Sequence, residues 1–369
     1  MAASTVPLPS DASQVARLLA SPEIIALIAE LQSTHWTGRP GYPIRSMVGL
    51  ALVKSVYALP TWTRAVNLVR EHVALLDVLG AAPSADAAYR FNKKLRENDG
   101  MLDGCIEKVI AALREARPEM GQTVAIDGSD MPAYANGHKH IGNKNGPLRT
   151  RFADPDAGWG HRSSISTRKG GAFYGYKLHM AICTRTELPL AWTVKAANEP
   201  ERAELPGLLD VIHERKFAPL VLVLDKGYDG QPMYDECESR GIRPVIALTE
   251  TQAVKDGKHK PPSCEHGEWT FAGADTRRGA TKWRCPTGGC SPASVWIKAD
   301  RLHPLIPHGS ERWKALYRQR TSVEREFGRL KTEWGLLPLR VRRIYRVKLH
   351  ADLTILAQLA SALLATRDT

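Results

Sequence analysis

Apolar residues recur at helical spacing through the first third of the chain. Four segments show this spacing between breaks made by proline, glycine and serine: SPEIIALIAELQ, IRSMVGLALVKSVYAL, TRAVNLVREHVALLDVLG and GMLDGCIEKVIAALREA. Side chains three and four residues apart share one face of a helix, so these segments are predicted to be amphipathic helices. No strand pattern interrupts them, and residues 1–118 are therefore predicted to form an all-helical domain.

Beyond residue 118 the pattern changes to short apolar runs rich in β-branched residues, which are typical of buried strands. The predicted elements are, in chain order, strands at 123–127, 173–183 and 188–196, a helix at about 200–214, a strand at 219–225, a helix at about 230–240 and a strand at 244–248. The second and third strands are separated only by TRTE and are predicted to form a hairpin. This order predicts a mixed α/β sheet with flanking helices.

Two segments of the second part interrupt this pattern. Residues 137–171 are rich in glycine, serine and basic residues and have no sustained period, so a long mobile loop that is disordered without a partner is predicted. Residues 250–304 are predicted to be a small β-rich insertion. Residues 119–249 and 305–369 would then form one core, with the strongly apolar C-terminal helix covering the sheet.

Composition limits the class of protein. The chain has 369 residues, 43% of them hydrophobic, which is enough for two or three domains and excludes a disordered protein. The net charge of +12 and the pI near 9.5 favour a polyanionic partner such as nucleic acid. The first residues do not resemble a signal peptide and no apolar stretch is long enough to span a membrane, so an intracellular, soluble protein is expected. Cys105, Cys183 and Cys237 are scattered singly and are expected to be reduced and structural.

Two of the predicted strands end in an acidic residue closely followed by glycine, in IDGSD and LDKGYDG. Each residue alone, Asp127 or Asp225, is equally typical of a turn at the end of a strand. If the two strands are parallel neighbours, however, both carboxylates lie at the same edge of the sheet. Asp130 and Asp229 lie beyond the apolar runs, where helix-capping or turn-forming roles are expected.

The segment YRQRTSVEREFGRLK at 317–331 places four polar residues along one side of a helix. At about 100° per residue, Tyr317, Arg320 and Lys331 lie within about 40° of Glu324, beside a stripe of apolar positions. A surface helix with an Arg320–Glu324 pair is the simpler interpretation. With Asp127 and Asp225, however, Glu324 makes three carboxylates on a basic protein, which suggests Mg²⁺ bound for phosphodiester chemistry.

These motifs resemble those of DDE transposases of bacterial insertion sequences, in particular the group whose last motif is Tyr, two residues, Arg, three residues, Glu, six residues, Lys. Tyr317, Arg320, Glu324 and Lys331 meet this spacing in full, and IDGSD and LDKGYDG resemble the first and second acid motifs. The resemblance extends from about residue 35 onward, because TGRPGYPIRSMVGLALVKS to SADAAYRFNKKLRE also looks like the helical domain of these transposases. It implies a ribonuclease-H-like core.

The resemblance also implies roles for individual residues. Asp127, Asp225 and Glu324 would be catalytic and would hold two Mg²⁺ or Mn²⁺ ions, while Tyr317, Arg320 and Lys331 would contact DNA phosphates near the scissile bond. The implied activity is binding of terminal inverted repeats, phosphodiester hydrolysis and DNA strand transfer. Because two DNA ends must be synapsed, a homodimer is expected in the synaptic complex, in the cytoplasm at the nucleoid.

Further basic residues are candidates for DNA contact. Lys93 and Lys94 lie in YRFNKKLRE, which suits a helix lying on phosphates, although a solvated surface explains it nearly as well. The segment RVRRIYRVK contributes Arg340, Arg342, Arg343, Arg346 and Lys348, which are expected to follow the DNA backbone. His179 lies within a predicted strand and is expected to be a packed residue without a catalytic role.

The insertion contains four potential zinc ligands, Cys264, His266, Cys285 and Cys290, in SCEHGEW and RCPTGGCS. Two such pairs can form a tetrahedral site that holds together a segment with little core of its own. Reduced surface cysteines in a small β unit are the alternative. Trp269, Trp283 and Trp296 are expected to form the core of the insertion, although a stacked DNA base is conceivable.

These observations favour an insertion-sequence transposase and leave two alternatives. One is a DNA-binding derivative that no longer cuts, such as a repressor or a domesticated transposase; the presence of all three acids argues against it. The other is a stand-alone metal-dependent nuclease.

Overall fold

The structure is a computed structural model that describes residues 12–34, 41–141, 149–162 and 169–368. Its first part is helical, as predicted. The helices are α1 (Ala12–Leu19), α2 (Pro22–Ser33), α3 (Ile44–Val56), α4 (Trp62–Glu71), α5 (Val73–Leu79), α6 (Ala85–Glu97) and α7 (Asp99–Ala116). The side chains of Thr61 and Ser84 cap α4 and α6, and Gly80, with φ of 73°, ends α5. The predicted helix TRAVNLVREHVALLDVLG is divided at His72, whose backbone is extended.

The second part contains a mixed six-stranded sheet. Its strands are β1 (Thr123–Pro132), β4 (Gly158–Arg162), β5 (Gly171–Cys183), β6 (Pro189–Ala196), β7 (Val221–Leu224) and β8 (Arg243–Ile246). The order β6–β5–β1–β7–β8 has β5 antiparallel to both neighbours and β1, β7 and β8 parallel, while β4 also pairs with β5. The predicted hairpin and both buried parallel strands are confirmed, and this order is that of a ribonuclease-H-like core.

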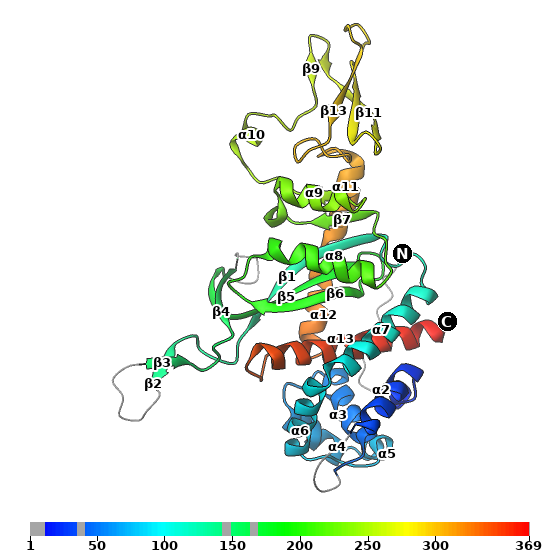
Figure 1. The fold of residues 1–369 in the computed structure, drawn as a ribbon, viewed down its shortest axis with the longest axis vertical. Coiled ribbons are helices and arrows are strands. Elements are labelled where there is room, and N and C mark those ends of the chain that lie inside the picture. The colour runs from blue at the N-terminus through cyan, green and yellow to red at the C-terminus, as the bar shows by residue number, and fades with distance from the viewer. Residues whose placement is uncertain (1–11, 35–40, 142–148, 163–168, 369) are drawn as a thin grey trace.

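Helices and short 3-10 turns surround the sheet (Figure 1). They are η1 (Glu201–Glu204), α8 (Leu205–Glu214), η2 (Lys226–Tyr228), α9 (Gln231–Ser239), α11 (Glu311–Tyr317), η3 (Arg318–Arg320), α12 (Thr321–Thr332) and α13 (Ile344–Arg367). The predicted single helix at 317–331 is therefore two helices joined by η3. The apolar stripe of α12 packs inward as predicted, since Val323, Phe327 and Leu330 are buried.

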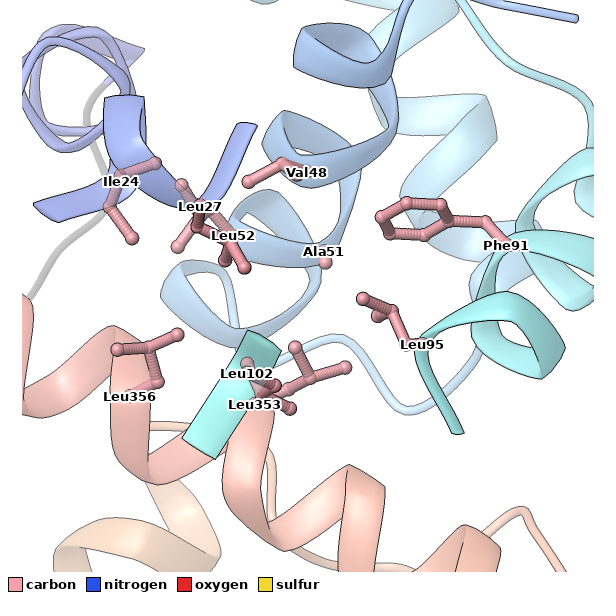
Figure 2. Close-up of a pocket in the computed structure, with 10 residues that line it drawn as sticks. All are labelled: Ile24, Leu27, Val48, Ala51, Leu52, Phe91, Leu95, Leu102, Leu353 and Leu356. Atoms are coloured by element: carbon pink, nitrogen blue, oxygen red, sulfur yellow. The ribbon is translucent and has the colours of Figure 1, made fainter. Parts of the chain in front are cut away.

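The C-terminal helix α13 joins the helical part to the sheet (Figure 1). It packs against β6, where Trp192 donates a hydrogen bond to Asp352 at 2.7 Å. On its other side, Leu353 and Leu356 line a small apolar cavity of about 20 Å³ together with side chains from α2, α3, α6 and α7 (Figure 2). The helix was predicted to cover the sheet; in addition, the two parts of the protein share one hydrophobic core around it.

The same helix is long and apolar enough to meet the criteria for a membrane span. However, 72% of its most apolar window is buried inside the protein. Its apolar surface is therefore already used by the fold, and α13 is a core helix.

Two predictions about loops need correction. β1 does not end at Asp127, because residues 128–132 continue to pair with the long strand β5. The segment 137–171, predicted to be a disordered loop, contains β2 (Lys139–Ile141), β3 (Arg149–Phe152) and β4; its residues 142–148 and 163–168 lie outside the described residues. Buried Asp154 organises this segment by accepting a hydrogen bond from the Tyr176 hydroxyl at 2.8 Å.

The insertion lies at the end of the molecule opposite to the N-terminal helices (Figure 1). It contains α10 (Gln252–Lys255), the two-stranded pair β9 (Ser263–Cys264) and β10 (Gly267–Glu268), and the sheet β11 (Thr270–Asp275), β12 (Ala280–Arg284) and β13 (Ser294–Lys298). Trp269 and Trp283 form its small core, as predicted. Trp296 does not, because 44% of it is exposed and its ring faces Arg278 and Lys282.

Candidate active site and basic groove

The pairing of β1 with β7 brings Asp127 and Asp225 together. The two strands are parallel, and their last paired residues are Ala125 and Val223. Asp127 lies two residues after Ala125, and Asp225 lies two residues after Val223. Side chains two residues apart in a strand share a face, so the same register places the two carboxylates opposite one another on the face that carries Val223. The chain then leaves β7 in η2, where the Asp225 carboxylate accepts the Gly227 N–H at 2.7 Å.

The helix α11 covers this face of the sheet. The apolar residues that pack together here are Val221, Val223, Val245 and Ile306 with Trp313, Leu316 and Tyr317. Since α11 continues through η3 into α12, its docking on β7 carries Glu324 to the edge of the sheet where the two aspartates lie. Hydrophobic packing therefore determines where the third carboxylate is placed.

Arg320 lies between two of the three carboxylates. Its guanidinium contacts the Asp127 carboxylate at 3.4 Å and the Glu324 carboxylate at 2.6 Å. The side chains of Asp127 and Arg320 are 17% and 20% exposed, whereas that of Glu324 is 53% exposed. The Arg320–Glu324 pair considered in the sequence is thus present, and the same arginine links it to the sheet.

Burial makes the negatively charged forms of Asp127 and Asp225 less stable than they would be in water. Burial and, next, the charge of Asp225 raise the pKa of Asp127 to about 7, and the Gly128 N–H and Arg320 only partly oppose this rise. Burial also raises the pKa of Asp225. The site is therefore short of positive charge near neutral pH, which is the environment that a bound cation relieves.

The other two residues of the helical motif occupy different positions. The Lys331 ammonium donates a hydrogen bond to the Ser129 hydroxyl at 2.6 Å, so it lies over β1 just past Asp127. Tyr317 stacks on Trp313 with a centroid distance of 4.6 Å. The structure thus arranges Tyr317, Arg320 and Lys331 around the edge of the sheet that carries the acids.

Asp130 and Asp229, the other two aspartates near the ends of these strands, are paired with arginines. Asp229 is fully buried and accepts two hydrogen bonds from Arg301, both at 2.7 Å, as well as the Thr249 N–H at 2.6 Å. Asp130 forms an ion pair with Arg162 at 3.4 Å. Both contacts are structural, since the first holds the end of the insertion to the core and the second holds the strand β4 to it.

A fourth carboxylate, Glu201, lies beside the site and was not considered in the sequence. It pairs with Lys177 at 2.5 Å, and a Cβ added to Gly128 would lie 3.2 Å from its Oε1 atom. Its charge contributes to the raised pKa of both Asp127 and Asp225. The signal that could have found it is its place in NEPERAE, an acid directly before the helix that follows the hairpin.

The donor set at this edge fits a hard divalent cation. Carboxylate oxygens are the ligands that Mg²⁺ and Mn²⁺ prefer. The acids are not tightly clustered, however: within the part of the chain that the structure describes, the one group of three or more such ligands whose atoms all lie within 4.8 Å of one another is Cys264, His266, Cys285 and Cys290. Residues Asp127, Asp225 and Glu324 are thus chemically suited to the ion but are held further apart, with Arg320 between two of them.

A basic groove of about 720 Å³ lies between the N-terminal helices and the segment before α13. The cationic residues that line it are Lys54, Arg90, Lys93, Arg96, Arg340, Arg342 and Arg346. Arg340 and Arg342 both lie over the ring of Tyr134 at 5.2 Å, and Tyr89 on the opposite wall is 54% exposed. Cations beside exposed aromatic rings are typical of a nucleic-acid surface.

The predicted DNA contacts divide between this groove and other places. Lys93, Arg340, Arg342 and Arg346 line it, but Lys94, Arg343 and Lys348 do not. Arg343 instead pairs with Asp156 at 3.1 Å and donates its backbone N–H to Asp154. The basic composition of RVRRIYRVK predicted a contact between Arg343 and the DNA backbone, but composition does not show which charges are already paired within the protein.

Lys54 is an unusual member of the groove because it is buried. Its ammonium lies 3.4 Å from His350 Nδ1, and the other ring nitrogen of His350 bonds the Leu336 carbonyl at 3.1 Å. Burial lowers the pKa of Lys54 to about 8 and that of His350 to about 3, so His350 is neutral. Among the described residues no carboxylate pairs with Lys54; besides His350, its ammonium lies over the ring of Trp62 at 5.7 Å from the centroid, and all three residues line the groove.

His179 is completely buried in β5 beside Gly128. Burial lowers its pKa to about 4, so the ring is neutral at physiological pH. It is a packed residue of the sheet, as predicted.

The sheet order with acids on adjacent parallel strands defines a ribonuclease-H-like enzyme core. Residues 118–359 match the family described as the transposase DDE domain. Because the match covers more than half of the chain, the protein belongs to the DDE transposase family. Members of this family are enzymes that act on DNA and generally use divalent metal ions.

Two further comparisons add little to this result. Among solved structures, the chain is similar to a piggyBac transposase in a cryo-EM structure of its synaptic complex with hairpin DNA, with a TM-score of 0.45 and 14% sequence identity. The alignment covers 97% of this chain and 75% of that chain. A comparison with curated proteins found no match.

Proposed function

We propose that this transposase binds the terminal inverted repeats of an insertion sequence, hydrolyses phosphodiesters there and joins the freed 3′ ends to target DNA. The observation that carries the proposal is the register of β1 and β7, which sets Asp127 opposite Asp225 on the face to which α11 and α12 bring Glu324. These three residues would hold two Mg²⁺ or Mn²⁺ ions. Such ions activate the attacking water or hydroxyl and stabilise the leaving oxygen.

Arg320 and Lys331 act on the DNA in this proposal. Arg320 leaves Glu324 and Asp127 when a scissile phosphate enters, because that phosphate offers it a bidentate anion. Lys331, held over β1 by Ser129, binds a neighbouring phosphate. When Arg320 moves to the phosphate, the carboxylates of Asp127 and Glu324 become free to bind metal. The complete metal site therefore forms only when DNA is present.

The DNA duplex extends from the acidic site to the basic groove. β1 leads from Asp127 towards Tyr134, which lies under Arg340 and Arg342 in the groove wall. Seven residues of extended chain span about 20 Å, which is less than the roughly 34 Å of one DNA turn. One bound end can therefore contact both places, with Lys93, Arg96 and Arg346 on its phosphates.

Two copies of the chain pair in the synaptic complex, because transposition joins two ends of one element. The proposed location is the cytoplasm, at the nucleoid.

A cleavage and joining assay tests this function. The full chain is incubated with Mg²⁺, a supercoiled target plasmid and labelled duplexes that carry the sequences flanking its own gene. The expected products are nicked or cut ends and ends joined to the plasmid. The variant Asp225→Asn, which keeps the size of the side chain, is the matched control and should give neither.

The three outcomes of this assay separate the candidate functions. Joined products support the transposase. Cutting without joining indicates a stand-alone nuclease, and specific binding without cutting indicates a DNA-binding derivative. Either of the last two results contradicts the proposal.

A further inference from the structure

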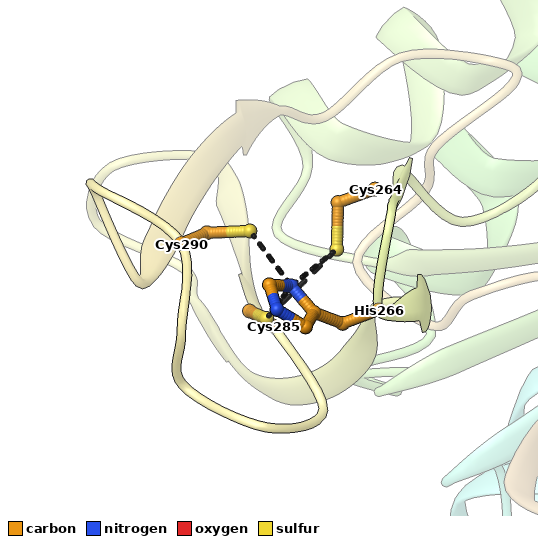
Figure 3. Close-up of side chains that lie close together, drawn as sticks. All are labelled: Cys264, His266, Cys285 and Cys290. Atoms are coloured by element: carbon orange, nitrogen blue, oxygen red, sulfur yellow. Dashed lines mark hydrogen bonds between the residues drawn. The ribbon is translucent and has the colours of Figure 1, made fainter.

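The insertion gathers four metal-ligand side chains from separate stretches of chain. Cys264 ends β9 and His266 lies in the turn to β10, while Cys285 follows β12 and Cys290 lies in the loop to β13. Their Sγ atoms and the ring of His266 face one another (Figure 3). All four offer a ligand atom within 4.8 Å of the others.

The distances between these atoms match the edges of a tetrahedral zinc site. Bond lengths of about 2.3 Å for Zn–S and 2.0–2.1 Å for Zn–N give tetrahedral edges of about 3.8 Å between two sulfurs and about 3.6 Å between sulfur and nitrogen. The Cys264 and Cys285 sulfurs are 3.8 Å apart. His266 Nδ1 lies 3.8, 3.7 and 3.5 Å from the sulfurs of Cys264, Cys285 and Cys290.

Neither a disulfide nor apolar packing accounts for the cluster. A disulfide requires sulfurs about 2.05 Å apart, so the 3.8 Å separation of Cys264 and Cys285 is not a bond. Reduced cysteines elsewhere in the chain, Cys105, Cys183 and Cys237, are buried singly. Among the described residues, three thiols and an imidazole converge only in the insertion. The thiols pack on or beside the small apolar cluster of Trp269 and Trp283, but His266 is exposed, and apolar packing does not account for an imidazole among three sulfurs.

The surroundings of the cluster are also specific. A Cβ on Gly289 would lie 3.0 Å from His266 Nε2, so the loop between Cys285 and Cys290 packs closely against the imidazole. The cluster of buried apolar side chains in the insertion is small and consists of Trp269, Trp283 and Cys285. Segments with so small a core are commonly held together by a metal.

We propose that Cys264, His266, Cys285 and Cys290 bind one structural Zn²⁺ through three thiolates and His266 Nδ1. Thiolate and imidazole ligands in a tetrahedron select zinc over the hard cations that suit carboxylates. Four protein ligands leave no open position, so this ion has no part in phosphodiester chemistry. It ties the β9–β10 pair to the end of β12 and so holds the insertion in one shape.

Metal analysis of the purified full chain tests the site without reference to activity. About one zinc per chain is expected in the wild-type protein and in Glu265→Gln, which changes an exposed residue between two ligands. Cys264→Ser, Cys285→Ser and Cys290→Ser should each lose most of the zinc. Cobalt added to chelator-treated wild-type protein should give the absorption bands of a tetrahedral thiolate site, and these bands should be absent from Cys285→Ser.

Limited proteolysis of the chelator-treated wild-type protein provides a second measurement that needs no variant. Cleavage is expected within the insertion, and added zinc should restore resistance there. Wild-type protein that carries no zinc and still resists the protease would overturn the proposal, as would full zinc content in the serine variants. A disulfide detected by mass spectrometry in the freshly purified chain would also overturn it. None of these results depends on whether the protein cuts or joins DNA.

Discussion

The acidic site on the sheet and the cysteine–histidine cluster of the insertion are assembled to different degrees. In the cluster, ligand atoms already lie at the spacing of a zinc tetrahedron. At the acidic site, Arg320 lies between Asp127 and Glu324, and the pKa of Asp127 is raised to about 7 by burial and by Asp225. In the roles proposed above, the zinc site is complete before DNA binds, whereas the acidic site is completed only when a DNA phosphate displaces Arg320.

The largest expected effect comes from removing a carboxylate of the acidic site. Asp127→Asn or Asp225→Asn should lower the rate of cleavage by about 10³-fold or more, the scale seen when one member of a catalytic set is removed. The zinc content should not change, because the two sites share no ligand. Asp130→Asn is the matched control, since Asp130 is close in sequence but pairs with Arg162. An equally large loss in the control would mean that the wrong aspartate has been assigned.

The next effect concerns the contact through which the insertion is attached to the sheet near the acidic site. Asp229→Asn breaks a buried, doubly hydrogen-bonded pair with Arg301 and should lower the free energy of unfolding by about 3–5 kcal/mol. Thermal and denaturant melting would measure this. Asp210→Asn, at an exposed pair with Arg240, should cost less than about 1 kcal/mol. Similar values for the two variants would show that the buried pair does not hold the two regions together.

Arg320→Ala tests whether the acidic site is completed by DNA. Loss of a charge-assisted phosphate contact should lower cleavage by about 10- to 100-fold and make the salt dependence of DNA binding shallower by about 0.9 in the log–log slope. Arg325→Ala removes an arginine of the adjoining helix α12 that pairs with Glu187, away from the acids, and should leave both quantities near the wild-type values. If Arg320→Ala changes neither the salt slope nor the cleavage rate, Arg320 does not contact a phosphate and its role is limited to the structural pair with Glu324.

The smallest effect is a dependence of DNA affinity on pH. Burial lowers the pKa of Lys54 to about 8, and only the protonated form carries the charge that attracts a phosphate, so affinity should fall a few-fold as pH rises through about 8. Lys54→Met should bind more weakly near neutral pH and lose this dependence. Lys93→Met, at an exposed lysine of the same groove, should keep the wild-type pH profile. A pH profile that is identical in all three proteins would exclude Lys54 as a phosphate contact.

Much of the fold was predictable because local patterns and tertiary structure agree. The helical spacing of the first 118 residues, the apolar runs before Asp127 and Asp225, and the hairpin of β5 and β6 all appear as predicted. The spacing of Tyr317, Arg320, Glu324 and Lys331 likewise pointed to the edge of the sheet. These features depend on residues that are close in sequence, where periodicity alone determines which face a side chain occupies.

Other features depended on contacts between distant residues. β1 continues past Asp127 because β5 is long enough to pair with it. β4 forms because residues 171–175 of β5 extend beyond the pairing of β5 with β6 and bond to residues 158–162. Glu201 reaches the acids only once η1 folds back beside Gly128. Arg343 was assigned to DNA from its neighbours in sequence, yet Asp156 already pairs with it.

Residue type and spacing were enough to predict the type of most main elements and to name the candidate acids and the candidate ligands of the insertion. Which charges remain available, and how closely the side chains approach one another, followed only from the tertiary structure. It set the four candidate zinc ligands at distances that suit a tetrahedron, placed Arg320 between two carboxylates and left Lys54 without an acidic partner among the described residues. The physical reason is that pairing and pKa depend on distance and burial, and both are set by segments far apart in the chain.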